Sequence, residues 1–321
     1  MSWLACVTCA AVALVAPAAA DAAPAACTGT APIVCHYDVA PGNYDITATI
    51  GAGTGLAVEA RRRIFTPGEA GTRSATVNVR EPEGQPTGQG GTGTPGLTLT
   101  FDGTTPAVSR VTVKPARKAR VVYLAGDSTV CDQPTAPYTG WGQMITQWAP
   151  RGIVVANYAD SGESAGSFLA DPALFPTMQP LIAPGDPVLI QFGHNDKATT
   201  AENFRADLTA LINGVRAKQG FPILVTPTVR RLFSGTELTP TALHINSLGV
   251  DLPAEMRAVA ATEGVPLIDL TAKSEALVES LGPAESSRLY LTLATDGVND
   301  NTHFSEYGAT KMAELVIDSL R

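Results

Sequence analysis

Apolar residues alternate with polar ones over much of the first third of the chain. The alternation is clearest in four stretches, residues 44–50, 75–79, 97–101 and 111–113. A period of two residues is typical of β-strands that turn one face toward a core. Because turns rich in Gly, Pro and Thr separate these strands, the pattern predicts a small N-terminal β-sandwich accessory domain over residues 25–115.

One stretch inside this domain has a different composition. Residues 82–96 consist almost only of Gly, Gln, Thr and Pro. Such a segment has too few apolar side chains to bury a core, so it predicts a flexible loop. Residues 115–118, with the sequence PARK, form the predicted linker to the rest of the chain.

Beyond residue 119 the period changes. Continuous apolar runs occupy residues 121–124, 153–155, 188–190, 223–225 and 267–268. Runs of this kind are typical of strands buried on both faces. Between them lie helical patterns, the clearest with Phe204, Leu208, Leu211 and Val215 on one face. Alternating strands and helices predict a doubly wound α/β domain with a parallel sheet over residues 119–321.

The N-terminus is interpreted as a secretory signal. Residues 4–20 carry no charge and end in small residues, which predicts a signal peptide over residues 1–24. The first three residues, MSW, depart from the usual pattern because they include no basic residue, and an apolar N-terminal helix is the alternative interpretation. We expect a secreted or periplasmic protein that is not attached to a membrane after cleavage.

The net charge and the cysteine content narrow the range of possible functions. With a net charge of −8, the chain lacks the basic surplus that binding to nucleic acid or to an anionic membrane requires. Cys27 and Cys35 are placed to close a small loop by a disulfide, whereas Cys131 is left as a packing residue. No cysteine and histidine spacing typical of zinc is present, so we predict no metal site.

Polar motifs follow the first three predicted strands of this domain, and a fourth motif lies near the C-terminus. They are GDST at 126–129, NYADSGES at 157–164 and GHND at 193–196, and then DNTH at 300–303. Loops at the carboxyl ends of parallel strands are where such sheets carry their chemistry. Ser128 is a candidate nucleophile and His303 the base that accepts its proton. Asp300 lies three residues before His303, so its carboxylate can reach the imidazole within one turn, and we expect both residues to lie on one loop.

An oxyanion site can be assembled from the remaining motifs. The backbone N–H groups of Ser128 and Gly162 and the side-chain amide of Asn195 are candidate donors. Structural roles are the alternatives: a helix N-cap for Ser128, a left-handed turn for Gly162 and a cap for Asn195. A metal site can also be drawn from four side chains, but it would leave Ser128 without a purpose. Those four are His194, Asp196, Asp300 and His303.

Together and in this order, the four motifs resemble the signature blocks of the SGNH (GDSL-type) hydrolases. The resemblance covers the whole α/β domain. It implies a flavodoxin-like three-layer sandwich and a serine carboxylic-ester hydrolase that needs no cofactor. The catalytic set that it implies is Ser128, Asp300 and His303, with Ser128, Gly162 and Asn195 around the oxyanion. Since His303 must be neutral to accept a proton, activity should rise as the pH becomes mildly alkaline.

Longer stretches around these motifs resemble one branch of the SGNH hydrolases. LAGDSTV at 124–130, YTGWGQ at 138–143 and DNTHFS at 300–305 look like the rhamnogalacturonan acetylesterases. The resemblance implies removal of O-acetyl groups from pectin, with acetylated plant cell-wall polysaccharide as the partner. Many relatives have Arg where this chain has Glu163, which leaves the preferred sugar open. The candidate sugar contacts are Tyr138, Trp141, His194, Arg230 and Arg231. The alternative for each of them is packing, structural hydrogen bonding or a position on a solvated surface.

Two other functions remain open. The same residues serve an acetylxylan esterase or a broad-specificity arylesterase equally well. A non-catalytic carbohydrate-binding protein, in which the β-domain carries the function, is the alternative from a different class.

Overall fold

The computed structural model describes residues 27–91 and 93–321, so the predicted signal peptide lies outside the described residues. The first part forms two antiparallel sheets. One sheet has the order β1 (Cys27–Thr28), β2 (Ile33–Tyr37), β7 (Leu97–Asp102), β4 (Gly55–Val58), β5 (Arg62–Phe65). The other has the order β6 (Gly71–Val79), β3 (Gly42–Ile50), β8 (Val108–Pro115).

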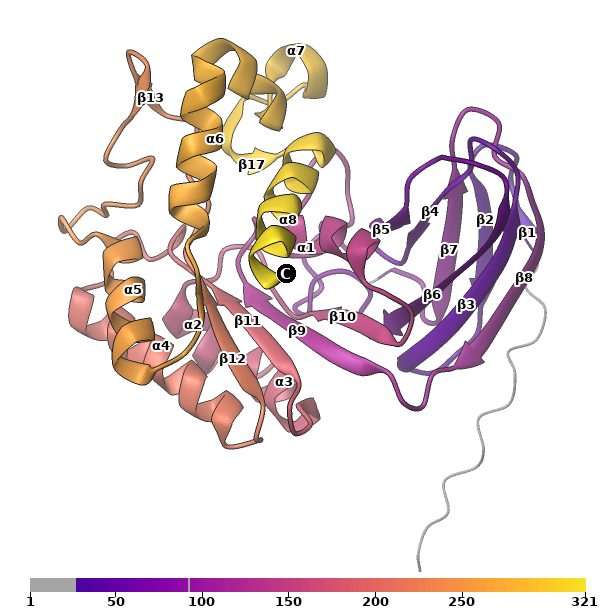
Figure 1. The fold of residues 1–321 in the computed structure, drawn as a ribbon, viewed down its shortest axis with the longest axis horizontal. Coiled ribbons are helices and arrows are strands. Elements are labelled where there is room, and N and C mark those ends of the chain that lie inside the picture. Colours follow the sequence, from indigo (N-terminus) through magenta and orange to yellow (C-terminus); the bar gives the residue numbers. More distant parts are fainter. Residues whose placement is uncertain (1–26, 92) are drawn as a thin grey trace, which may run out of the picture.

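The two sheets pack face to face around a core of their own (Figure 1). In β3 every second residue is buried, which is the pattern that the sequence predicts for this stretch. The facing sheet contributes four fully buried side chains to this core, those of Leu56, Leu97, Leu99 and Phe101. A disulfide joins Cys27 to Cys35 across β1 and β2.

The second part contains a five-stranded parallel sheet. Its order is β10 (Ile153–Asn157), β9 (Arg120–Gly126), β11 (Pro187–Gln191), β12 (Phe221–Val225), β15 (Leu267–Ile268). In chain order this is 2-1-3-4-5, the flavodoxin-like order, in which the strand order reverses beside β9. The predicted fold class, an α/β three-layer sandwich, is therefore confirmed.

Helices cover both faces of this sheet (Figure 1). One face packs against α2 (Ala165–Ala170), α3 (Phe175–Met178), α4 (Ala201–Arg216) and α5 (Leu252–Glu263). The other packs against α1 (Trp141–Met144), α6 (Leu270–Glu285) and α8 (Glu306–Leu320). In α4 the predicted apolar stripe, from Phe204 to Val215, is buried.

Short elements complete the chain. They are η1 (Ile145–Trp148), η2 (Gln179–Leu181), β13 (Phe233–Ser234), β14 (Glu237–Leu238), η3 (Ser286–Leu289), β16 (Tyr290–Leu291), α7 (Leu293–Asp296) and β17 (Asp300–Phe304). The last motif, predicted to lie on a loop, lies on β17, which pairs with β16 and leads into α8. Among the described residues, no helix combines the length and the apolar character needed to span a bilayer.

The β-sandwich packs against the α/β part through polar bonds. The Arg62 side chain donates to the Val155 carbonyl (3.3 Å) in β10 and lies 3.5 Å from the Asp132 carboxylate. The Gln143 amide of α1 donates to the Ala60 carbonyl (2.6 Å). Arg62 and Asp132 are both buried, so the contact excludes water and fixes the two parts relative to each other.

Candidate active site

The candidate nucleophile lies in a tight turn directly after β9. The Asp127 carboxylate accepts hydrogen bonds from the Thr129 N–H (2.9 Å) and hydroxyl (2.7 Å), which closes the turn around Ser128. A Cβ at Gly126 would lie 2.7 Å from the Val130 side chain, so only glycine fits where the strand enters the turn. Ser128 itself remains 8% exposed, enough for its hydroxyl to face a cavity.

The residues of β17 bring the base to this hydroxyl. His303 Nε2 lies 2.8 Å from Ser128 Oγ, and His303 Nδ1 lies 2.7 Å from Asp300 Oδ2. The other carboxylate oxygen of Asp300 accepts the backbone N–H groups of Thr302 (2.8 Å) and His303 (3.0 Å). Partial burial alone would raise the pKa of Asp300, but these hydrogen bonds and the adjacent imidazole hold it well below its usual value. The carboxylate is therefore ionised and fixed against Nδ1.

Two further predicted residues line the same cavity. It has a volume of about 410 Å³, and its lining includes Ser128, Gly162, Asn195 and His303. Gly162 adopts φ +88°, a left-handed conformation that favours glycine. The Asn195 amide nitrogen donates one hydrogen to the Glu163 carbonyl (3.0 Å) and keeps a second for another acceptor. The structure thus brings the residues of the three candidate oxyanion donors to one cavity, which the base also lines.

A buried pair ties the first motif to the third. His194 Nδ1 lies 3.1 Å from Asp127 Oδ2, and both side chains are almost fully buried. Burial alone would raise the pKa of Asp127, but His194 and the bonds from Thr129 lower it to about 2. Burial lowers the pKa of His194 despite the attraction of Asp127, so His194 is neutral and donates from Nδ1. Its Nε2 is a buried acceptor without a partner among the described residues.

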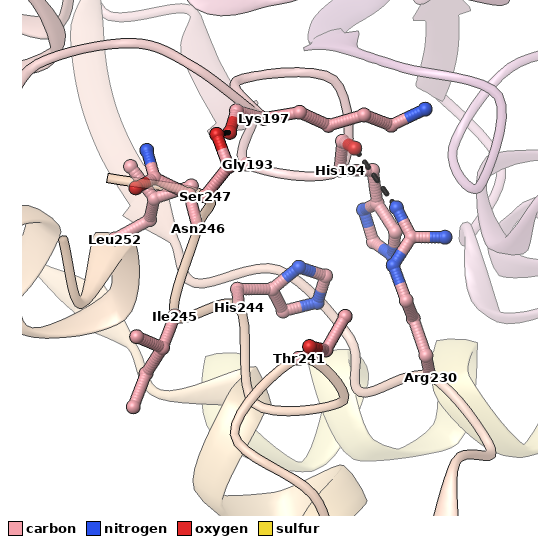
Figure 2. Close-up of a pocket in the computed structure, with 10 residues that line it drawn as sticks. All are labelled: Gly193, His194, Lys197, Arg230, Thr241, His244, Ile245, Asn246, Ser247 and Leu252. Atoms are coloured by element: carbon pink, nitrogen blue, oxygen red, sulfur yellow. Dashed lines mark hydrogen bonds between the residues drawn. The ribbon is translucent and has the colours of Figure 1, made fainter. Parts of the chain in front are cut away.

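Beside the active-site cavity lies a second pocket of about 270 Å³, drawn in Figure 2. Arg230 projects into it and donates to the His194 carbonyl (2.8 Å) and, through its other terminal nitrogen, to the Thr302 hydroxyl. Lys197 and His244 also line it. His244 lies in a turn at φ +61°, with its ring edge-on to that of His194. Arg230 therefore lies next to the motif that carries the base.

Other predicted sugar contacts have different surroundings. Tyr138 lines the active-site cavity and packs edge-on against His303, with ring centroids 5.4 Å apart. The prediction for Trp141 is wrong: its side chain is 0% exposed and its indole N–H donates to Gln191 (2.9 Å), so no sugar can stack on it. His194 is likewise too buried to meet a sugar directly. Arg231 donates to the Pro283 carbonyl (3.3 Å) and lines neither pocket.

Sequence reasoning missed the glutamines of the site. Gln133 donates to the Ser128 carbonyl (3.1 Å) and fixes the turn of the nucleophile. Gln85 and Gln89 come from the segment predicted to be a flexible loop, yet both line the cavity and Gln85 is only 3% exposed. No signal marked them, because neither periodicity nor a motif distinguishes a glutamine that bonds to a distant segment from one in solvent.

Comparison with known proteins gives the same family for the α/β part. The model of the GDSL-like Lipase/Acylhydrolase family matches residues 124–311. Rhamnogalacturonan acetylesterase RhgT of Bacillus subtilis (strain 168) is 39% identical over 217 residues, 64% of this chain and 90% of the relative. The probable rhamnogalacturonan acetylesterase YesY of the same organism is 32% identical over 212 residues, 63% of this chain and 93% of the relative.

A solved structure extends the likeness to the β-sandwich. The crystal structure of protein YXIM from Bacillus subtilis aligns with a TM-score of 0.54 and 26% identity. The alignment covers 90% of this chain and 80% of the other. Because the α/β part alone is too short to account for such coverage, the alignment includes much of the β-sandwich.

Proposed function

The chain belongs to the GDSL-like lipase/acylhydrolase family and is a carboxylic-ester hydrolase, and we propose that it removes O-acetyl groups from rhamnogalacturonan-type pectin. The observation that carries the proposal is the continuous series of hydrogen bonds from Ser128 Oγ through His303 to Asp300 (2.8 and 2.7 Å), open to the cavity. A nucleophile, its base and the group that orients the base are the parts that acyl transfer to serine requires.

The proposed first step is acylation. Ser128 Oγ attacks the acetyl carbonyl carbon while His303 Nε2 takes the hydroxyl proton, and Asp300 stabilises the imidazolium that forms. The negative charge on the carbonyl oxygen is met by the N–H groups of Ser128 and Gly162 and by the Asn195 amide. Collapse of this tetrahedral intermediate breaks the ester C–O bond, and the proton on His303 passes to the departing sugar oxygen, which leaves as a hydroxyl group.

Deacylation repeats the same proton transfers with water. His303 takes a proton from a water molecule whose oxygen attacks the acetyl carbon of the Ser128 ester. The tetrahedral intermediate then releases acetate, and the proton returns to Ser128 Oγ. No step calls for a cofactor, because the nucleophile, the base and the oxyanion donors all belong to the chain.

The polysaccharide assignment rests on the similarity to RhgT and YesY and is supported by the surroundings of the serine. Tyr138 stands at the cavity beside His303, where an aromatic face can contact a sugar ring. Arg230 and Lys197 line the neighbouring pocket and supply positive charge for the carboxylate of a uronate unit. Positive charge at this point matters because the chain as a whole is acidic.

We also propose that the protein is exported, to the periplasm or to the medium. The uncharged residues 4–20 support this, and so does the disulfide between Cys27 and Cys35, a bond typical of oxidising compartments. Detection of the mature chain outside the cytoplasm, with an N-terminus between residues 21 and 25, tests this part of the proposal.

Acetate release from acetylated rhamnogalacturonan and from acetylated xylan tests the activity. We expect release from the pectic polymer by the wild type and none by Ser128→Ala, which has no nucleophile. Release from xylan alone would keep the mechanism but refute the substrate. If the wild type hydrolyses neither polymer nor a small acetyl ester, the esterase function is wrong.

A further inference from the structure

The β-sandwich reaches the active site through residues 85–90. Within this segment Gln85 is buried, and Gln85, Gln89 and Gly90 line the cavity that holds Ser128 and His303. A Cβ at Gly90 would lie 2.5 Å from Pro134 of the α/β part, so the two segments are in direct contact there. The wall of the catalytic cavity is therefore built by both parts of the chain.

This segment holds the loop that carries Gly162. The Ser161 N–H donates to Gln85 Oε1 (2.6 Å). The Asp160 carboxylate accepts the backbone N–H and the hydroxyl of Thr87, at 2.8 and 3.0 Å. The Gln89 amide nitrogen donates both to Asp160 Oδ1 (2.8 Å) and to the Ser161 carbonyl (2.7 Å). Both backbone polar groups of Ser161 are thus satisfied by the β-sandwich.

The bond from Gln89 bears on catalysis because of peptide geometry. The Ser161 carbonyl and the Gly162 N–H belong to one planar trans peptide unit, so they point in opposite directions. Fixing the carbonyl toward Gln89 fixes the N–H on the other side. Within residues 27–91 and 93–321 the Gly162 N–H has no hydrogen-bond partner, as expected for a donor kept for a ligand.

Little else holds this peptide unit in its orientation. Apart from Gly162 itself and its chain neighbours Ser161 and Glu163, no described residue lies within 4 Å of the place where a Cβ of Gly162 would be, so no other segment packs against that side. Rotation of a peptide unit that precedes glycine meets little steric resistance, because glycine tolerates both signs of φ. The Ser161 hydroxyl accepts a bond from Gln133 (3.4 Å), but a side-chain bond does not set the direction of the following carbonyl.

We propose that Gln89 is a positioning residue for the oxyanion site and that the β-sandwich is thereby a working part of the catalytic centre. The inference rests on the proposed esterase function. Gln89 does not touch the reacting atoms; it acts through the Ser161–Gly162 peptide, whose N–H it orients toward the developing oxyanion. Donation to the carbonyl also polarises the same peptide unit and strengthens its N–H as a donor.

The test is steady-state kinetics with 4-nitrophenyl acetate, a substrate too small to reach beyond the serine and the oxyanion site. Gln89→Met keeps the length of the side chain but removes both donor hydrogens. Loss of a whole oxyanion donor costs a hundredfold or more in kcat, and a donor that is retained but no longer oriented should cost about tenfold. We expect KM to change less than about twofold, because the ground-state ester makes little use of this donor.

Two further variants separate positioning from a general structural effect. Gln89→Lys restores a donor between Asp160 and the Ser161 carbonyl, so kcat should return to within about threefold of the wild type. Gln179→Met is the matched control: its amide also donates to a backbone carbonyl, that of Gly214 (2.9 Å), but it lines no part of the cavity. It should leave kcat unchanged, and thermal melting should show all three variants folded.

Several results would overturn the proposal. They are an unchanged kcat in Gln89→Met, an equal loss in Gln179→Met, a loss confined to KM, or a loss seen on acetylated rhamnogalacturonan but not on 4-nitrophenyl acetate. The last would make Gln89 a sugar contact instead. An inactive wild type refutes the esterase function itself, whereas an active wild type with an equally active Gln89→Met refutes only the positioning role.

Discussion

Replacement of Asp300 by asparagine should exchange the donor and acceptor roles of the two ring nitrogens of His303, while the side chain at position 300 keeps its shape. Asp300 Oδ1 accepts two backbone N–H groups, those of Thr302 (2.8 Å) and His303 (3.0 Å). An asparagine must keep its carbonyl oxygen at this position, because its NH₂ group would otherwise face two donors. The NH₂ group is therefore directed at His303 Nδ1, which must become an acceptor. The proton of the neutral imidazole then sits on Nε2, facing Ser128 Oγ.

A histidine protonated on Nε2 cannot take the serine proton. We expect Asp300→Asn to lower kcat by a thousand- to ten-thousandfold, because the corresponding change in a serine protease triad costs about 10⁴. Such a loss corresponds to about 4 to 5 kcal/mol in the activation barrier. KM should change little, because Asp300 lies behind the imidazole and not against the substrate. Steady-state kinetics on a small acetyl ester measures both constants.

Asp318→Asn serves as the control for Asp300→Asn. Asp318, on α8, forms an exposed ion pair with Arg321 (3.3 Å), so its replacement should leave kcat unchanged. Thermal melting of both variants checks that the fold is intact. A kcat for Asp300→Asn within tenfold of the wild type would refute the reasoning, because it would mean that another group holds His303 in its working tautomer.

Three further changes have definite expected results. Ser128→Ala should abolish acetate release but keep polysaccharide binding, which isothermal titration calorimetry measures. Asn195→Ala should lower kcat a hundred- to thousandfold on a small acetyl ester and change KM much less, since the amide acts on the oxyanion. Burial raises the pKa of Glu59 from 4.5 to about 8 despite the nearby Arg62, so the folded chain keeps a proton there that the unfolded chain releases. The contribution of this group to wild-type stability should thus be largest below about pH 4.5 and should fall as the pH rises to about 8. Urea unfolding at pH 5.5 and 8 measures this fall in the free energy of unfolding, and Glu59→Gln should reduce it by more than about 1 kcal/mol. An equal fall in the wild type and the variant would refute the prediction.

The sequence predicted those parts of the fold that local periodicity encodes. Alternation gave the strands of the sandwich, continuous apolar runs gave the buried parallel strands, and the apolar stripe gave α4. The motif positions predicted which residues meet at the sheet edge, because parallel strands all end on the same side. His303 lies on β17, outside the parallel sheet, so its contact with Ser128, 175 residues away in the chain and 2.8 Å away in space, was indicated by the resemblance of the motifs to those of the SGNH hydrolases and not by the common edge.

The errors have a common physical cause. Trp141 was a candidate sugar contact with packing as the alternative. Exposure depends on what packs around a residue, and α1 places this indole against Gln191 in the core. Residues 82–96 were expected to be flexible because they cannot bury apolar surface. Their order comes instead from polar bonds to Asp160 and Ser161, more than 70 residues away in the chain. Neither hydrophobic periodicity nor composition records bonds of that kind.

The polar character of the contact between the two parts has an energetic consequence. Asp132, four residues after the nucleophile, is buried beside Arg62 of the sandwich, and burial raises its pKa even with that partner present. Without the sandwich, Asp132 and Asp160 would lose the cation and the donors that compensate their desolvation. The turn of the nucleophile and the loop of Gly162 are thus both attached to carboxylates whose partners lie in the first hundred residues. The β-sandwich therefore contributes to the order of the catalytic loops as well as to the wall of the cavity.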